Sequence, residues 1–254
     1  DFDKRNGIIH VQSGVLLSEM LDILVSRGWF LKITPGTKFI TVGGAIASDV
    51  HGKNHHIDGC FSDSVIEFQL MLPVGNIVTC SKTINSELFY ATCGGMGLTG
   101  VILDAKIQLI PIKSSNINQS IFKTKNLEDT FSVFECYKDQ PYSVAWIDCF
   151  SKNKKLGRGI VSIGGFSDTG GLKYNPHRTI TLPKYIPSTI LLNSINMKLF
   201  NKLYYYKHSR RTSYSTVNLD DFFYPLDRIE NWNDIYGKSG FTQYQFILPK
   251  QLSF

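Results

Sequence analysis

Residues 41–56 read TVGGAIASDVHGKNHH and combine paired glycines, small side chains and three of the chain's six histidines. Glycine permits backbone conformations and close approaches that larger residues do not. Main-chain amides presented by such a turn can bind a phosphate or the carbonyl oxygens of a heteroaromatic ring. The block is therefore a candidate cradle for a flat or anionic ligand.

A second glycine-rich stretch, GGMGLTG at residues 94–100, precedes a long strand pattern. Two such loops can hold opposite sides of one elongated ligand. Neither stretch is a P-loop, since neither contains GK[ST], and the glycines do not follow GxGxxG in a βαβ unit, as a dinucleotide site would require. Two other interpretations of the first block stay open. One is an ordinary turn with hydrogen-bonded histidines; the other is a metal site at His51, His55 and His56, which lacks a carboxylate partner at helical spacing.

The composition excludes several classes of protein. The chain has 254 residues, of which 43% are hydrophobic and 13% aromatic, too many for a disordered chain. No apolar run approaches the roughly 18 residues that cross a bilayer, and no basic-then-apolar leader is present. These features indicate a location in the cytoplasm or at the periphery of a membrane.

The net charge of the chain changes sign near residue 112. Residues 1–112 hold 8 Lys and Arg against 10 Asp and Glu, a net of −2, whereas residues 113–254 hold 19 against 11, a net of +8. An anionic ligand, a membrane surface or nucleic acid could explain the basic part. Nucleic acid is disfavoured because no recognition helix or RNA-binding aromatic motif is evident.

Hydrophobic periodicity predicts a mixture of helices and strands. The first helix covers residues 14–27, with Ser13 as a possible N-cap and Gly28 at its end. Residues 166–183 and 209–222 lack a pattern and are expected to be long loops. Further helices are expected over 86–92, 127–137 and 189–203, and strands over 29–33, 65–72, 77–80, 101–112, 143–150, 159–165 and 241–248.

Several segments together resemble a known family. These are Pro35-Gly36-Thr37, the 41–56 block, SELFYATCGGMGLTG at 86–100, and the segments 143–162, 222–237 and 240–249. They are similar to FAD-linked oxidases of the vanillyl-alcohol-oxidase superfamily. The resemblance implies an α+β fold, in which residues 1–112 form the C-terminal part of a PCMH-type FAD-binding domain. Residues 113–254 would form an α+β substrate (cap) domain with an antiparallel sheet, truncated at its C-terminus.

The resemblance also implies roles for individual residues. His51 and Lys53 would be catalytic at the junction of flavin and substrate, and no metal is expected. Tyr205 falls where the family has a tryptophan in the pocket wall, which leaves the shape of the pocket open. The residues that would line a noncovalently bound FAD are Gly36, Thr41, Val42, Gly43, Gly44, Ser48, Asp49, Val50, His51 and Ile102. Those that would contact substrate are Lys53, Tyr205, Tyr224, Gln243 and Gln245.

The activity implied is oxidation of the C2′ hydroxyl of a polyprenyl-phosphate-linked ribose, with hydride transfer to flavin N5. A short-chain reductase partner would then complete an epimerisation. Binding of the substrate phosphate would explain the positive net charge of residues 113–254. An ordinary solvated surface also explains the basic residues of this part, which include Lys152, Lys154, Lys155, Arg158, Lys207, Arg210 and Arg211. Alternatives are a sugar-lactone or alditol oxidase that uses oxygen, and a basic module that binds nucleic acid or a membrane surface.

The resemblance further implies an internal fragment. The family's pyrophosphate-binding loop would precede Asp1, and a C-terminal lysine regarded as catalytic would follow Phe254. We therefore expect residues 1–254 alone to bind FAD weakly or not at all and to be inactive.

Overall fold

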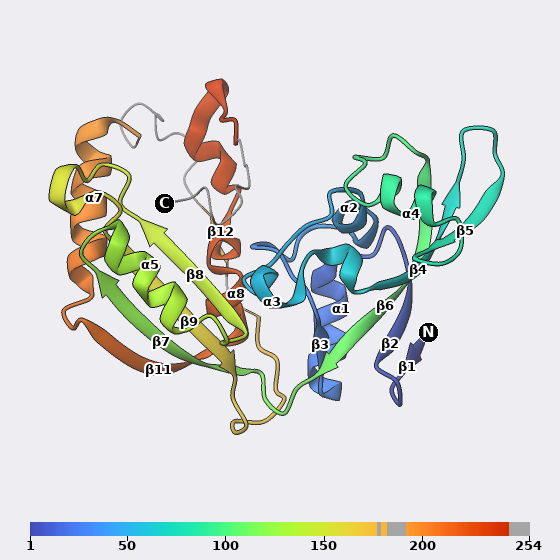
Figure 1. The fold of residues 1–254 in the computed structure, drawn as a ribbon, viewed down its shortest axis with the longest axis horizontal. Helices are drawn as coiled ribbons and strands as arrows, with labels where there is room; N and C mark the ends of the chain where they lie inside the picture. The colour runs from blue at the N-terminus through green and yellow to red at the C-terminus, as the bar shows by residue number, and fades with distance from the viewer. Residues whose placement is uncertain (177–178, 182–191, 244–254) are drawn as a thin grey trace.

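The computed structural model describes residues 1–176, 179–181 and 192–243, and within them the chain forms two large antiparallel sheets (Figure 1). The first sheet has six strands, and its longest, β6 (Val101–Pro111), pairs with three others. Along β6 the side chains of Ala105, Ile107 and Leu109 alternate into the core, as the sequence pattern predicts. The other strands are β1 (Phe2–Asp3), β2 (Ile8–Gln12), β3 (Trp29–Leu31), β4 (Val65–Met71) and β5 (Ile77–Ser81).

Helix α1 (Leu17–Leu24) packs on this sheet through one apolar face. Its residues Leu17, Met20, Leu21 and Leu24 are buried, with the spacing of an amphipathic helix. The helix starts later than predicted, because the N–H of Leu16, and not a Ser13 cap, is bound by the carboxylate of Glu19 at 2.8 Å. A 3₁₀ turn over Val25–Arg27 then ends at Gly28, whose φ of 82° is the left-handed conformation that favours glycine.

Three short helices complete the first part of the chain. They are α2 (Val42–Ala47), α3 (His55–Asp58) and α4 (Ser86–Thr92). The bounds of α4 agree with those expected from the sequence. Helices α2 and α3 occupy the glycine- and histidine-rich block.

The second sheet has four antiparallel strands, in the order β11 (Thr212–Asn218), β7 (Asn116–Thr124), β9 (Gly159–Phe166) and β8 (Tyr142–Ile147). Helix α5 (Leu127–Cys136) lies against β7 and β9. Helix α7 (Ser194–Lys207) lies at the far end of the molecule from the first sheet (Figure 1). The remaining elements are α8 (Leu219–Phe223), the 3₁₀ turns Asn153–Lys155, Pro225–Arg228 and Trp232–Ser239, and the parallel pair β10 (Ile180–Thr181) and β12 (Ile229–Glu230). The predicted α+β class with an antiparallel second sheet is confirmed.

Two expectations for the second part are wrong. Residues 209–222 are not a loop, because β11 and α8 lie there, and β7 was missed altogether. Both strands are rich in Ser, Thr, Asn and Gln, so they lack the apolar alternation that identifies a strand. Of the strand expected over 241–248, residues 241–243 form none, and the rest lie outside the described residues.

Aromatic rings join the two sheets. The ring centroid of Phe30 in β3 lies 5.0 Å from that of Phe166 in β9 and 5.1 Å from that of Phe223 in α8. Tyr142 in β8 lies 4.9 Å from Phe223. The chain passes from one sheet to the other between Pro111 and Asn116, next to the boundary expected near residue 112. The buried residues of both parts nevertheless form one continuous cluster.

No helix in the described part of the chain is long and apolar enough to cross a bilayer.

Candidate active site

A cavity of about 1180 Å³ lies between the two parts of the chain. One wall is formed by Pro35, Gly36 and residues of the 51–57 segment, and the other by residues of α5 and β8. Three predicted site residues, Gly36, His51 and Lys53, therefore lie around one space. The cavity is large enough for a planar cofactor ring and a small substrate.

Lys53 extends from this cavity towards α8. Its Nζ donates a hydrogen bond of 2.9 Å to the main-chain oxygen of Phe223 and lies 5.6 Å from the ring centroid of Phe222. Within the described residues, no carboxylate forms an ion pair with this ammonium group. Burial therefore acts unopposed and lowers the pKa of Lys53 to about 8. A cation held in this way can stabilise negative charge that develops beside it.

The three histidines of the block form a row at the mouth of the cavity. The ring centroids of His51 and His55 are 5.7 Å apart, as are those of His55 and His56. A nitrogen of His55 contacts the Gly52 carbonyl at 3.2 Å, and one of His56 contacts the Gln140 carbonyl at 3.0 Å. In the part of the chain that the structure describes, no group of three His, Cys, Asp or Glu side chains is placed to hold a metal ion.

The paired glycines belong to helix α2 and not to an open turn. The N–H groups of residues 42–45 all donate within the protein, those of Gly43 and Gly44 to Ser13 O at 2.8 Å and Thr41 Oγ1 at 3.1 Å. The expectation that they present free amides is therefore wrong. A Cβ at Gly43 would lie 2.9 Å from that of Ser13, so close packing against the chain requires the glycine.

The outer face of α2 is open and meets the second glycine-rich stretch. Gly44 and Ser48, one turn apart, are both exposed. The Met96 N–H donates to Ala47 O at 2.8 Å, and Gly94 N–H donates to Ile46 O at 3.1 Å. The two glycine-rich stretches thus lie side by side in direct contact.

Other predicted FAD residues are more enclosed. The side chains of Val42 and Ile102 are buried in the core, and the main-chain N–H of Val42 donates to Val15 O at 2.9 Å. Asp49 has a φ of 41°, and its carboxylate accepts the Ser62 N–H at 2.9 Å, which fixes the turn after α2. Val50 is half-buried against the core.

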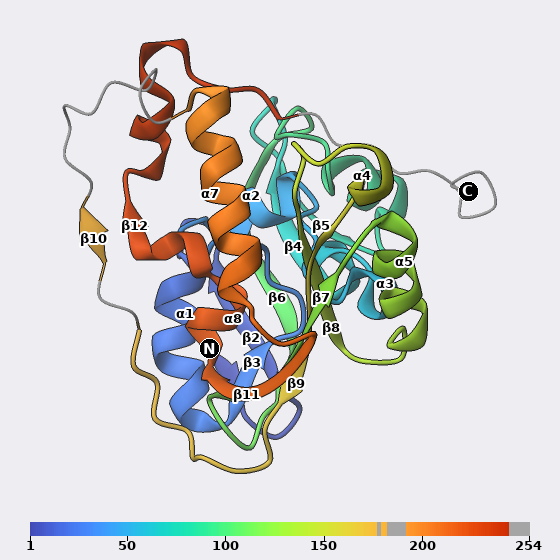
Figure 2. The ribbon, with the colours of Figure 1, turned by 90° about the vertical axis from the view of Figure 1, so that its left-hand side faces the viewer.

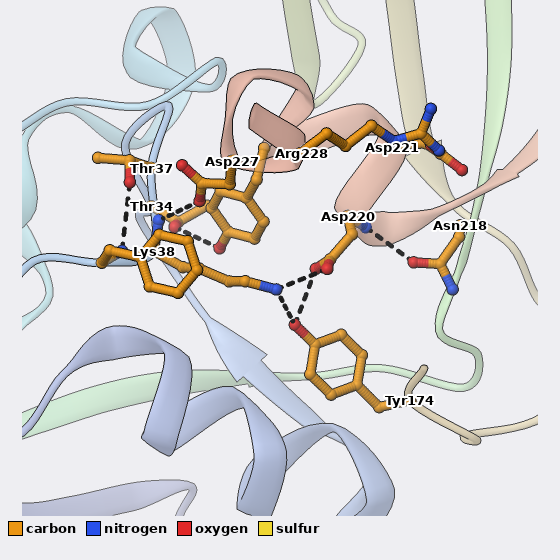
Figure 3. Close-up of polar contacts among 11 residues, drawn as sticks. Thr34, Thr37, Lys38, Tyr174, Asn218, Asp220, Asp221, Asp227 and Arg228 are labelled. Carbon is orange, nitrogen blue, oxygen red and sulfur yellow. Dashed lines mark hydrogen bonds and ion pairs between the residues drawn. The ribbon is translucent and has the colours of Figure 1, made fainter. Parts of the chain in front are cut away.

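A second lysine, Lys38, fixes the loop that carries Gly36 (Figure 3). Its Nζ lies 2.5 Å from Asp220 Oδ2 and 2.9 Å from the Tyr174 hydroxyl, which itself donates to the same carboxylate at 2.8 Å. The main-chain N–H of Lys38 donates to Asp227 at 2.9 Å. We call this set of four residues the Lys38 network.

Tyr224 supports the same loop. It is fully buried, and its hydroxyl shares a hydrogen bond of 2.6 Å with Thr34 Oγ1. Burial raises its pKa, so the phenol stays protonated. Tyr224 is not among the residues that line the cavity, and its hydroxyl contacts the loop that carries Gly36.

Tyr205 lies on the buried side of α7 and is not among the residues that line the cavity. Its hydroxyl donates to Thr124 O at 3.0 Å, and the guanidinium of Arg158 stacks 4.5 Å from its ring centroid. Arg158 is itself buried in an ion pair with Asp148 at 2.7 Å, so it does not belong to a solvated basic surface. Gln243 is exposed and lies in no strand, and Gln245 lies outside the described residues.

Comparison with known proteins agrees with the first part of this description. Residues 1–81 match the family described as FAD binding domain. The N-terminal part of this chain is therefore similar to FAD-binding domains. The match ends before residues 94–100, so the second glycine-rich stretch lies outside it. FAD as the predicted cofactor agrees with this match.

Individual relatives extend the similarity. Decaprenylphosphoryl-β-D-ribose oxidase of Mycolicibacterium smegmatis is 33% identical over 98% of this chain, which spans 56% of that protein's length. D-lactate dehydrogenase of Anaerostipes hadrus is 35% identical over 50% of the chain and 28% of its own length. L-gulonolactone oxidase of Scyliorhinus torazame is 30% identical over 46% of the chain and 26% of its own length. The predicted resemblance to FAD-linked oxidases is confirmed.

Sequence reasoning missed the far wall of the cavity. Phe131 and Phe134 of α5 and Ser143 of β8 line it. The amphipathic pattern of α5 predicts the helix, but no local signal says which side of it faces a cavity. Lys38 was missed because its partner Asp220 lies 182 residues away.

Proposed function

We propose that this chain is the core of an FAD-dependent oxidoreductase that acts on a secondary hydroxyl group. The observation that carries the proposal is the cavity between the two parts, where residues of the FAD-binding domain meet a second wall beside the buried cation of Lys53. When bound there, FAD would supply an acceptor for a hydride from the substrate carbon.

The residues of the chain supply binding and charge. The open face of α2 at Gly44 and Ser48 is available for the cofactor, and Gly36 borders the cavity without a side chain to fill it. Lys53, held by Phe223 O, would stabilise negative charge beside the reacting atoms. His51 at the cavity mouth is a candidate for orienting the substrate hydroxyl or accepting its proton.

For the substrate we propose a polyprenyl-phosphate-linked ribose, oxidised at C2′ to the keto sugar. The support is the similarity of 98% of the chain to an oxidase named for such a substrate. A reductase acting on the keto sugar would be the partner, and contact with a membrane that carries the lipid follows from the same proposal. Noncovalent attachment of FAD is part of it.

A sugar-lactone or alditol oxidase is the second candidate, since an L-gulonolactone oxidase is also a relative. Reduction of a dye acceptor with lipid-linked ribose would support the first candidate. Peroxide formation with free lactones or alditols, and no turnover of the lipid-linked sugar, would support the second. These assays use the full-length protein, and absence of FAD-dependent turnover with both substrate classes would contradict the proposed function.

A further inference from the structure

Helix α7 turns an apolar stripe away from the protein. Ile195, Leu199, Leu203 and Tyr206 are spaced by four, four and three residues, which places them on one face of the helix. Their exposed fractions run from 54% at Leu199 to 76% at Ile195. A contiguous exposed apolar stripe of this kind marks an interaction surface.

The face that α7 presents to the protein is, by contrast, polar and aromatic. Asn201 donates to Asp148 Oδ1 at 2.8 Å, and the Tyr204 ring lies 4.7 Å from that of Trp146. Together with the hydroxyl of Tyr205, these contacts hold the helix on the end of the second sheet. The apolar stripe is therefore not needed for that attachment. Figure 2 shows α7 at the front of this side of the molecule.

Basic side chains border the stripe. Lys198, Lys202 and Lys207 lie on α7, and the helix contains no Asp or Glu. The Lys198 Nζ lies 5.9 Å from the Phe150 ring centroid, which places the loop with Lys152, Lys154 and Lys155 beside the helix. In that loop Leu156 is 59% exposed. Apolar residues bordered by lysines complement an anionic lipid surface, because the apolar residues fit the acyl chains and the lysines fit the negatively charged headgroups.

We infer that α7 and the loop 150–156 form a surface that binds an anionic phospholipid membrane. At 14 residues α7 is too short to cross a bilayer, so it would lie in the interface with its stripe among the acyl chains and its lysines at the headgroups. The biological reason for this surface rests on the proposed function, because a polyprenyl substrate resides in a membrane. Vesicle binding itself needs no flavin chemistry.

The test compares the protein with a stripe variant, Ile195→Gln, Leu199→Gln and Leu203→Gln. Binding is measured by co-sedimentation with phosphatidylcholine vesicles that contain phosphatidylglycerol, and with vesicles of phosphatidylcholine alone. We expect the unaltered protein to prefer the anionic vesicles and to be released by salt. The stripe variant should bind at least about tenfold more weakly, because its apolar insertion is lost.

A matched control changes three exposed apolar residues of the β4–β5 region, Val74→Gln, Ile77→Gln and Ile84→Gln, which should leave binding unchanged. Circular dichroism checks that each variant is folded. Equal binding of the stripe variant, or no vesicle binding by the unaltered protein, would overturn the inference. So would a stable dimer that the stripe variant dissociates, because a second copy would then cover the stripe. None of these outcomes depends on the oxidoreductase assay, so the membrane-binding inference can be contradicted without contradicting the proposed function.

Discussion

Lys38 and Lys53 both extend from the FAD-binding part of the chain to α8, but they meet different surroundings there. Lys38 reaches the carboxylate of Asp220 and the hydroxyl of Tyr174, so its charge is matched in a buried setting. Lys53 reaches only a carbonyl oxygen, Phe223 O, among the contacts of its ammonium group with polar atoms in the described residues. The comparison separates a lysine that fastens two parts of the chain from one whose charge is left available to a ligand.

Breaking the Lys38 network should have the largest effect on stability. Lys38→Met removes the cation beside the buried carboxylate of Asp220, and loss of one partner of a buried ion pair costs about 3–5 kcal/mol. We expect this decrease in the free energy of unfolding, measured by denaturant titration. FAD affinity should also fall, because the loop that carries Gly36 loses its attachment.

The matched control is Lys82→Met, which breaks an ion pair of 3.1 Å with Asp63 whose two side chains are nearly half exposed. Its expected cost is below about 1 kcal/mol. Equal losses for the two variants would mean that the Lys38 network does not fasten the parts together.

Lys53→Met should act in the opposite direction on stability. Folding lowers the pKa of Lys53 from 10.5 to about 8. At pH 7 the buried ammonium group therefore lowers the free energy of unfolding. A methionine of similar length removes that cost, and we expect the variant to be more stable at pH 7 by about 1–3 kcal/mol. Between pH 8 and 10.5 the unfolded chain binds more protons than the folded one, so the stability of the unaltered protein rises with pH. The difference in stability between Lys53→Met and the unaltered protein therefore becomes smaller over this range. Unfolding titrations at pH 7 and above pH 10 measure this.

The same lysine should set the pH dependence of the proposed reaction. Lys53 is mainly charged below pH 8 and neutral above it. If its cation stabilises developing negative charge, the rate of flavin reduction should fall as the pH rises through about 8, and Lys53→Met should lower that rate by at least about 100-fold. Stopped-flow absorbance of the FAD-loaded full-length protein measures this step. A profile for Lys53→Met that keeps the same inflection would assign the titration to another group.

The contrast between the two lysines also explains what could be predicted from the sequence. Local periodicity predicts β4, β5 and β6 of the first sheet and helix α4 nearly to their ends, whereas β1 and β2 are not predicted and α1 begins three residues later than predicted. The polar strands β7 and β11 were not, because their pairing in the sheet, and not an apolar pattern, makes them strands. The family resemblance implies a role for Lys53, whereas the role of Lys38 depends on Asp220 and Tyr174, which only the folded chain brings near.

The smallest predicted effect concerns Tyr224, which supports the loop that carries Gly36. Tyr224→Phe keeps the buried ring but removes the hydroxyl that shares a hydrogen bond of 2.6 Å with Thr34. Thr34 is itself 3% exposed, so water cannot easily replace the lost partner. We expect a loss of about 1 kcal/mol in the free energy of unfolding, smaller than for Lys38→Met because no charge is left behind. If Tyr224 contacts substrate as the family resemblance implies, its variant should also raise the Michaelis constant; an unchanged constant with the stability loss would assign Tyr224 to the support of the loop alone.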